Sequence, residues 1–448
     1  MKNHLLITFI VLISVAFSSC KTEIEEAVPS TGNADLTGYV ALGSSYTAGV
    51  TDGALYTTGQ QNSFPAILAK SFQLAGGGTF RQPDVNSETG INLEGNSKLA
   101  LYIASNCISA SELKTRFAAP AGDQQIFANS ISAQGPFHNL GVPGTKAENF
   151  RQQTFSDPNL GGNKFFSRFA KNPGVSSLLS EAVSQNPTFF TLLIGQEDIY
   201  DYARNGGDEM IILQITSVAI FNNEVDQIIN TLVFENADGA IANIPDPIDI
   251  PFFNTIPYDG LILTAAQAQN LNLIYLTDTS IQFQEGRNPY LVKDAATQSG
   301  FRHLKSDEMV LLSASVDSIC LGYGSYNFAI SKPWAFEDRH VLDQSELANI
   351  YSHLHSFNAK IKSIADVNGL AFVDLFDLFR QLHNGIKING VIFNNTYLKG
   401  QVYSLDGFHP TPRGYALIAN HFIDAINFKF GATLKKADPN AYPGIHFP

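Results

Sequence analysis

The chain has 448 residues, of which 44% are hydrophobic and 15% charged, and its 28 basic and 41 acidic side chains give a formal net charge of −13. A hydrophobic fraction of this size excludes a disordered chain, and the length predicts one large domain or two ordinary ones. Because nucleic-acid binding requires clustered Lys and Arg, which the sequence lacks, we expect no nucleic-acid partner.

The first residues carry a targeting signal. Lys2 precedes an apolar run from Leu5 to Phe17, which is shorter than the roughly 20 residues that a membrane-spanning helix needs. Small residues then precede Cys20, in a pattern that resembles the lipobox of bacterial lipoproteins. We therefore predict a signal peptide over residues 1–19 and membrane attachment through a lipid on Cys20. An ordinary signal peptide with an incidental cysteine is the alternative.

A polar tether follows over residues 20–36. Residues 21–26 read Lys-Thr-Glu-Ile-Glu-Glu, which resembles the export signal of some Gram-negative surface lipoproteins, although a solvated linker has the same composition. The expected location is the outer membrane of a Gram-negative bacterium, on its periplasmic or its outer face.

Two cysteines, Cys107 and Cys320, remain if Cys20 is lipidated. In an oxidising compartment they can form one disulfide, which would stabilise the fold by about 4–5 kcal/mol in the chain-entropy model. Two unrelated buried thiols are the alternative, because the sequence does not give the distance between their Cα atoms. The sequence holds no CxxC, HExxH or EF-hand pattern, so we expect neither a metal nor a cofactor.

Short apolar runs alternate with helical periodicity after residue 36. The expected strands, each bounded by turn residues, are 39–42, 189–194, 239–244 and 370–373. The expected helices are 64–74, 175–183, 218–234 and 346–367. This alternation predicts an α/β three-layer sandwich with a central parallel sheet flanked by helices.

Two long segments interrupt the alternation. Residues 75–135 and 247–345 exceed ordinary connections, and loops of such length are usually functional or carry structure of their own. We interpret them as large insertions that shape the site of a single domain over residues 37–430, which a tail over 431–448 follows. We expect a monomer.

A serine follows the first expected strand directly, in the run Gly43-Ser44-Ser45-Tyr46. Open α/β sheets build their sites at the carboxyl ends of strands, and a helix N-terminus there favours a developing negative charge. A pair of serines that caps a helix is the alternative interpretation.

A carboxylate and an imidazole lie three residues apart near the other end of the chain, at Asp406 and His409. If this segment forms one turn at a helix start, Asp406 can accept a hydrogen bond from the His409 ring and fix its tautomer. The second ring nitrogen is then free to face a serine hydroxyl. Combined with the strand-terminal serine, the pattern predicts a Ser-His-Asp triad.

At these positions the sequence resembles the SGNH or GDSL-type esterases and lipases. Four blocks match in family order, namely Gly43-Ser44-Ser45-Tyr46, Asn139-Leu140-Gly141-Val142-Pro143-Gly144, Gly195-Gln196-Glu197-Asp198 and the Asp406-x-x-His409 pair. The resemblance implies an SGNH hydrolase-like fold and a nucleophilic Ser45, with His409 as base and Asp406 orienting it. It also implies an oxyanion hole formed by Ser45, Gly144 and the residue at position 197.

Two positions depart from the family pattern. Ser44 replaces an Asp, and Glu197 replaces an Asn whose amide donates to the oxyanion. An ionised carboxylate has no proton to donate, and the loss of one oxyanion donor costs about 2.7–4 kcal/mol. Either burial keeps Glu197 protonated, so that it donates, or the side chain turns away and leaves the Ser45 and Gly144 amides to bind the oxyanion.

The sequence therefore predicts a carboxylic ester hydrolase that forms an acyl-enzyme, with an acylated glycan or a lipid as its substrate. The alternative is a surface-anchored ligand- or glycan-binding protein on a hydrolase scaffold with a degraded oxyanion hole, which the residues at positions 44 and 197 favour.

Overall fold

The computed structural model describes residues 28–105, 111–207, 214–234 and 236–448. Cys20 and Cys107 lie outside these ranges, so the lipid on Cys20 and the pairing of Cys107 with Cys320 stay predictions. Among the helices within the described ranges, none has both the length and the apolar character needed to cross a membrane.

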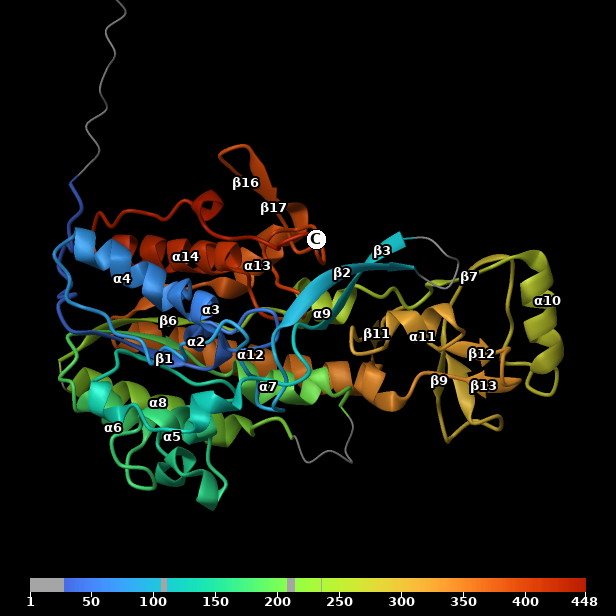
Figure 1. Ribbon diagram of the computed structural model, residues 1–448, viewed down its shortest axis with the longest axis horizontal. Helices are drawn as coiled ribbons and strands as arrows, with labels where there is room; N and C mark the ends of the chain where they lie inside the picture. The colour runs from blue at the N-terminus through green and yellow to red at the C-terminus, as the bar shows by residue number, and fades with distance from the viewer. Residues whose placement is uncertain (1–27, 106–110, 208–213, 235) are drawn as a thin grey trace, which may run out of the picture.

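A five-stranded sheet forms the centre of the larger part of the molecule (Figure 1). Its strands are β1 (Tyr39–Gly43), β4 (Asn139–Gly141), β5 (Phe189–Leu193), β6 (Asp238–Ala242) and β15 (Ala371–Val373). They lie in the order β15-β6-β5-β1-β4, and each neighbouring pair is parallel. β1 and β5 are buried along their whole length, as expected of strands with helices on both faces.

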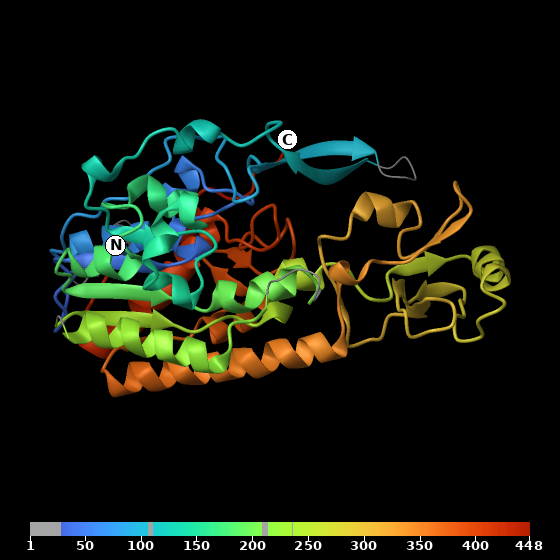
Figure 2. The same cartoon turned by 90° about the horizontal axis from the view of Figure 1, so that it is seen from below.

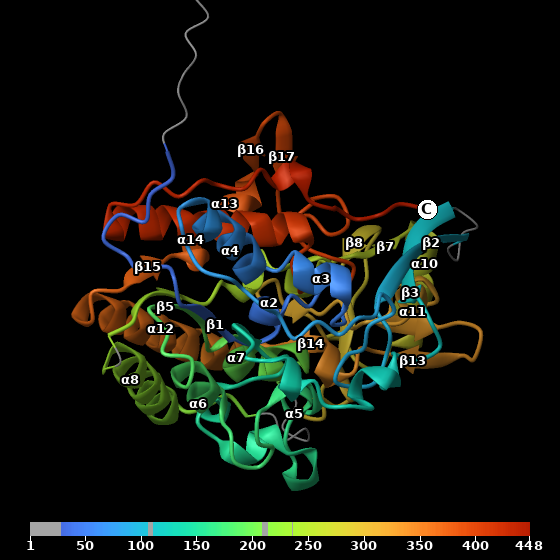
Figure 3. The same cartoon turned by 60° about the vertical axis from the view of Figure 1, so that its left-hand side comes forward.

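Helices cover the two faces of this sheet (Figure 3). On one face, α4 (Phe64–Leu74) packs against α14 (Pro412–Phe430), which also contacts β15 and β6. On the other face lie α6 (Leu178–Val183), α8 (Val218–Phe234) and α12 (Gln344–Val367). The predicted three-layer α/β architecture is confirmed.

The remaining helices of the main body are α2 (Ser45–Ala48), α3 (Thr57–Gln61), α5 (Lys164–Phe169), α7 (Gln196–Arg204), α9 (Pro251–Asn254) and α13 (Leu375–Asn384). A short hairpin also belongs to it, in which β16 (Ile386–Ile388) pairs with β17 (Val391–Phe393).

The second long segment forms a lobe beside the main body (Figure 2). Two hydrophobic clusters of its own lie within it, while Ile250, Phe253, Leu311 and Leu342 belong to the core of the main body. The lobe is therefore rooted in the main core and stabilised locally beyond it. Its elements are β7 (Leu261–Leu263), α10 (Ala265–Ile274), β8 (Gly286–Asn288), β9 (Leu291–Lys293), β10 (Phe301–His303), β11 (Met309–Val310), α11 (Val316–Cys320), β12 (Ser325–Asn327), β13 (Lys332–Trp334) and β14 (Val341–Leu342).

The first long segment contains a hairpin of β2 (Leu99–Ser105) and β3 (Ser111–Phe117) that reaches toward the lobe (Figure 2). Lys114 of this hairpin forms an ion pair with Asp317 of α11. The Tyr397 hydroxyl, which donates to the Leu405 carbonyl at 2.7 Å, lies beside the Thr115 side chain. The hairpin thus contacts both the lobe and the segment that leads to His409.

Residues next to the predicted domain bounds also belong to the core. Ala34 and Leu36, in the predicted tether, are buried together with Ala432 and Leu434 of the predicted tail. The Thr433 N–H donates to the carbonyl of residue 30 at 2.9 Å. The segment that precedes β1 and the segment that follows α14 therefore pack side by side.

Candidate active site

Three of the four sequence blocks meet at the carboxyl edge of the sheet. Ser45 begins α2 directly after β1, Gly144 follows β4, and Glu197 lies in the first turn of α7 after β5. The strands β4, β1 and β5 are direct neighbours and pair in register at their last residues. Because neighbouring parallel strands end at one edge, these residues come together although they are far apart in the sequence.

Glycine at position 43 allows the close turn from β1 into α2. A Cβ atom on Gly43 would overlap the Thr47 hydroxyl and lie 2.8 Å from the Leu193 carbonyl oxygen, inside van der Waals contact. The turn places Ser45 at the first position of α2, where the N-terminal end of the helix faces the site. The predicted helix after the serine exists, but it is a single turn.

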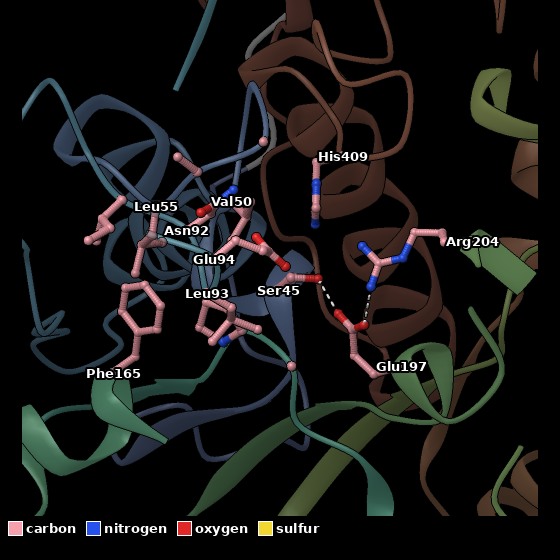
Figure 4. Close-up of a pocket in the computed structure, with 15 residues that line it drawn as sticks. Ser45, Val50, Leu55, Asn92, Leu93, Glu94, Phe165, Glu197, Arg204 and His409 are labelled. Carbon is pink, nitrogen blue, oxygen red and sulfur yellow. Dashed lines mark hydrogen bonds and ion pairs between the residues drawn. The ribbon is translucent and has the colours of Figure 1, made fainter. Parts of the chain in front are cut away.

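A pocket opens at Ser45, and the empty space in it, together with the open solvent at its mouth, amounts to about 450 Å³ (Figure 4). Residues 91–94 of the first long segment form part of its wall. None of its lining residues in the described ranges comes from the lobe. The residues that line it are Ser45, Val50, Gly53, Ala54, Leu55, Ile91, Asn92, Leu93, Glu94, Pro143, Gly144, Phe165, Glu197, Arg204 and His409.

Asp406 and His409 lie in a turn that precedes α14, which begins only at Pro412, and so not in the first turn of a helix. Asp406 Oδ2 accepts a hydrogen bond from His409 Nδ1 at 2.5 Å. Its Oδ1 accepts from the backbone N–H groups of Phe408 and His409 at 3.0 and 2.9 Å. Burial alone would raise the pKa of Asp406, but the His409 ring and these hydrogen bonds hold it below its ordinary value. The carboxylate thereby keeps a proton on Nδ1 and leaves Nε2 as the acceptor.

The Ser45 hydroxyl points to Glu197 in this structure. Ser45 Oγ donates to Glu197 Oε1 at 2.7 Å, as the dashed line in Figure 4 marks. His409 Nε2 is buried and has no hydrogen-bond partner in the described part of the chain. Both residues line the same pocket, so a rotation of Ser45 about its Cα–Cβ bond is the movement that would connect them. Such rotamer changes are fast compared with enzyme turnover.

Glu197 stays in the site and does not turn away. Its side chain is 3% exposed, and Oε2 accepts from Arg204 Nη2 at 3.1 Å. Burial raises the pKa of Glu197 above its ordinary value, while the Arg204 cation and the Ser45 hydroxyl act in the opposite direction. The carboxyl group therefore faces the Ser45 hydroxyl as an acceptor, with a cation beside it.

Arg204 is a site residue that the four blocks do not indicate. It ends α7, two helical turns after Glu197, so the two side chains project from one face of the helix. Arg204 Nη2 also donates to Asp201 at 2.8 Å, and the guanidinium lies 4.6 Å from the centre of the Phe408 ring. Glu197, Asp201 and Arg204 are spaced at i, i+4 and i+7, and this spacing predicts from the sequence that the three side chains share one face of the helix.

Gly144 lines the pocket. Its φ of +78° disfavours any side chain, and a Cβ atom would lie 2.7 Å from Leu93 Cδ1. No acceptor in the described ranges bonds to the Gly144 backbone N–H. Thr145 Oγ1 donates to the Val142 carbonyl at 2.7 Å, and Asn163 Nδ2 donates to the Pro143 carbonyl at 2.8 Å. The loop around Gly144 is therefore fixed by its own side-chain contacts.

Asp198, the neighbour of Glu197, binds Ala147, which lies three residues after Gly144 in the same loop. It is fully buried, and its two oxygens accept from the Ala147 N–H at 3.1 and 3.0 Å. Burial raises the pKa of Asp198 to about 6, although the bonds from Thr216 and Ala147 lower it. A carboxyl group next to the site thus titrates in the range where many enzymes work.

We expect Asp198→Asn to remove a pH dependence of stability. A folded pKa of about 6, above the ordinary 3.8, means that this group stabilises the fold below pH 3.8 and that its contribution is lost as pH rises through 6. The change amounts to about 3 kcal/mol. Asparagine keeps a carbonyl oxygen for the Ala147 N–H. Denaturant unfolding near pH 4 and near pH 8 should show the wild type losing stability relative to the variant, and a constant difference would contradict the titration of Asp198.

Comparisons with known proteins add a likeness of fold. No protein-family model matches the chain, and no curated protein does. Among solved structures, it is similar to a protein described as a GDSL-like lipase from Parabacteroides merdae, with 11% identity and a TM-score of 0.33 over 89% of this chain and 99% of that one. It is similar also to the acetylxylan esterase Axe2 from Geobacillus stearothermophilus, with 9% identity and a TM-score of 0.34 over 88% and 98% of the two chains.

A third similar structure is LAE5, an α/β hydrolase enzyme from the metagenome of Lake Arreo, with 10% identity and a TM-score of 0.35 over 88% of this chain and 96% of that one. Because each TM-score lies below 0.5, what the chain does must be inferred from its own sheet and its own site.

Proposed function

We propose that the chain is a serine ester hydrolase that cleaves carboxylic esters through an acyl-enzyme. The observation that supports this most strongly is the convergence of Ser45, the His409–Asp406 pair and the Gly144 amide on one pocket at the carboxyl edge of the sheet. A nucleophile, a base oriented by a carboxylate and a backbone donor are the groups that acyl transfer requires.

In the proposed reaction, Ser45 turns to His409, and Nε2 accepts the hydroxyl proton as Oγ attacks the carbonyl carbon of the ester. The carbonyl electron pair moves onto oxygen, and the Ser45 and Gly144 N–H groups bind the oxyanion. When the oxyanion collapses, the ester C–O bond breaks and the leaving alcohol takes the proton from His409. Water then attacks the acyl-enzyme in the same way and releases the carboxylic acid and Ser45.

The acyl group in this proposal is short and apolar. The pocket wall includes six aliphatic or aromatic side chains, namely Val50, Ala54, Leu55, Ile91, Leu93 and Phe165. Its volume of about 450 Å³ includes the open mouth, so the enclosed part holds only a small group. A glycan or a lipid as the alcohol part of the ester stays a proposal that rests on the expected surface location.

We further propose that a monomer is anchored to the outer membrane through the lipid on Cys20. The first described residue, Val28, is 83% exposed, and the dark blue segment with which the described chain begins lies at the end of the main body opposite the lobe (Figure 1). An anchor attached there would hold the lobe away from the membrane.

A ligand-binding protein on a hydrolase scaffold is the second candidate. It is favoured by the hydrogen bond from Ser45 to Glu197, since a hydroxyl held in this position is not deprotonated by His409. In that case the pocket would bind a ligand without chemical conversion, and the polar groups of the triad would act only as hydrogen-bonding partners.

Covalent labelling with a fluorophosphonate probe separates the two candidates, because the probe reacts only with an activated serine. We expect stoichiometric labelling, with the modified peptide located at Ser45 by mass spectrometry. The Ser44→Ala variant is a matched control, since Ser44 lacks a side-chain cap bond and is not in the pocket wall, and it should label as the wild type does. A protein that stays unlabelled would favour the binding candidate.

A further inference from the structure

The oxyanion of the proposed reaction lacks a side-chain donor at position 197. Glu197 accepts hydrogen bonds with both of its oxygens, from Ser45 and from Arg204, so it has no proton directed at the substrate. An unpaired carboxylate beside a developing oxyanion would repel it. A reactive site therefore needs a group that both balances the charge of Glu197 and supplies the missing donor.

Arg204 has donors left for such a role. In the described part of the chain its hydrogen bonds to Glu197 and Asp201 both use Nη2, and a guanidinium carries five N–H donors in one plane. Figure 4 shows the group between Glu197 and His409, with one nitrogen directed to Glu197 and another toward the space beside His409. The pocket wall includes this side chain.

The guanidinium is also held in place before any substrate binds. Two carboxylates bind one end of it, and its Cζ lies over the Phe408 ring, 4.6 Å from the ring centre. Asp201 is itself within 3.7 Å of Lys146 Nζ, which joins α7 to the loop that carries Gly144. A donor that is oriented in advance stabilises a transition-state charge without reorganisation, and a charged donor forms stronger hydrogen bonds than an amide.

We propose that Arg204 is a catalytic residue that donates an N–H to the oxyanion, with Glu197 as its positioning residue. The Glu197–Arg204 pair then supplies the oxyanion donor that an Asn side chain at position 197 supplies in the family pattern. This inference rests on the proposed ester hydrolysis. A guanidinium in this position could instead bind a carboxylate on the substrate, and the experiment below separates the two roles.

Steady-state kinetics of three variants on a neutral short-chain aryl ester test the proposal. Arg204→Gln should lower kcat about 100- to 1,000-fold and leave KM within a few-fold. The double variant Glu197→Asn with Arg204→Gln should recover most of the loss, because an amide at position 197 can donate in place of the guanidinium. Arg151→Gln removes a more exposed arginine of an ion pair with Glu224 outside the pocket, and it should leave kcat unchanged.

Two other results for the Arg204 variants would overturn the proposal. A loss in Arg204→Gln that the double variant does not recover would show a structural role. An unchanged kcat on the neutral ester, with a raised KM for a hemisuccinate ester, would show a substrate carboxylate site. Failure of the proposed function itself would be visible in the wild type, as turnover that Ser45→Ala does not lower, before any change at Arg204.

Discussion

Replacing Ser45 by alanine should lower kcat for a short aryl ester on the order of 10⁴- to 10⁶-fold, because the acyl-enzyme cannot form without the hydroxyl. The residual rate would come from substrate binding and from the oxyanion donors that the substitution leaves in place, which include the backbone amides of residues 45 and 144. The change removes one buried hydrogen bond, to Glu197, so the free energy of unfolding should fall by no more than about 1–3 kcal/mol. Initial rates and thermal unfolding on the same preparation check both values. A variant that keeps a substantial fraction of the wild-type rate would rule out Ser45 as nucleophile.

Replacing Asp406 by asparagine should lower kcat about 10⁴-fold. The Asn amide can donate to His409 Nδ1, and the neutral ring would then carry its proton on Nε2, which is the wrong tautomer to accept from Ser45. The backbone bonds from Phe408 and His409 to Oδ1 can persist on the amide oxygen, so the turn should keep its shape. Pre-steady-state measurement of acylation on a chromogenic ester gives the rate directly.

Asp52→Asn is the matched control for this change. Asp52 is a second carboxylate beside the same turn, where it accepts from the Leu405 N–H at 3.1 Å and from the Tyr56 hydroxyl at 2.8 Å, and it does not bond to His409. Its replacement should reduce kcat far less than that of Asp406. Similar losses in both variants would mean that the turn is merely disturbed and that the tautomer of His409 is not the cause.

The wild type and the Asp406→Asn variant should also differ in how their stability depends on pH. The pKa of Asp406 lies below its ordinary value in the folded protein, so this group stabilises the fold above the ordinary pKa of an aspartate, and the contribution is lost as pH falls through the lowered value. The Asp406→Asn variant lacks this contribution. Its stability relative to the wild type should therefore be lowest at neutral pH.

Much of the layered fold follows from periodicity. The helices α4 and α8 begin and end at the predicted residues, because apolar side chains at three- and four-residue spacing continue to the last turn of each. The strands β1 and β5 are continuous apolar runs between turn residues. The strand β4 is not predicted, because Asn-Leu-Gly is too short and too polar to form such a run, and only its pairing with β1 defines it.

The directions in which the side chains of the site point are harder to predict from the sequence than the helices and strands. The resemblance of the four blocks to a known family implies that Ser45, Gly144 and residue 197 form one site. Whether the Ser45 hydroxyl faces His409 or Glu197 depends on side-chain rotation, which no pattern encodes. The spacing of Glu197 and Arg204 shows a shared helix face, but that this face borders the pocket follows only from the packing of α7. The folding of the lobe from many short strands has no periodic signal either.

The inner part of the lobe is bonded to the turn that carries His409, whereas its outer part is not in contact with the pocket. At its root, the Phe252 N–H donates to the Gly407 carbonyl at 2.9 Å, and the Leu312 N–H donates to the Phe252 carbonyl at 2.8 Å, so this part supports the turn that carries His409. Farther out, Phe328 and Ile330 are exposed, and the described lobe contributes nothing to the pocket wall. Substitutions in the outer lobe should therefore leave the turn of His409 undisturbed, whereas a change that breaks the hydrogen bonds of Phe252 would remove a support of that turn.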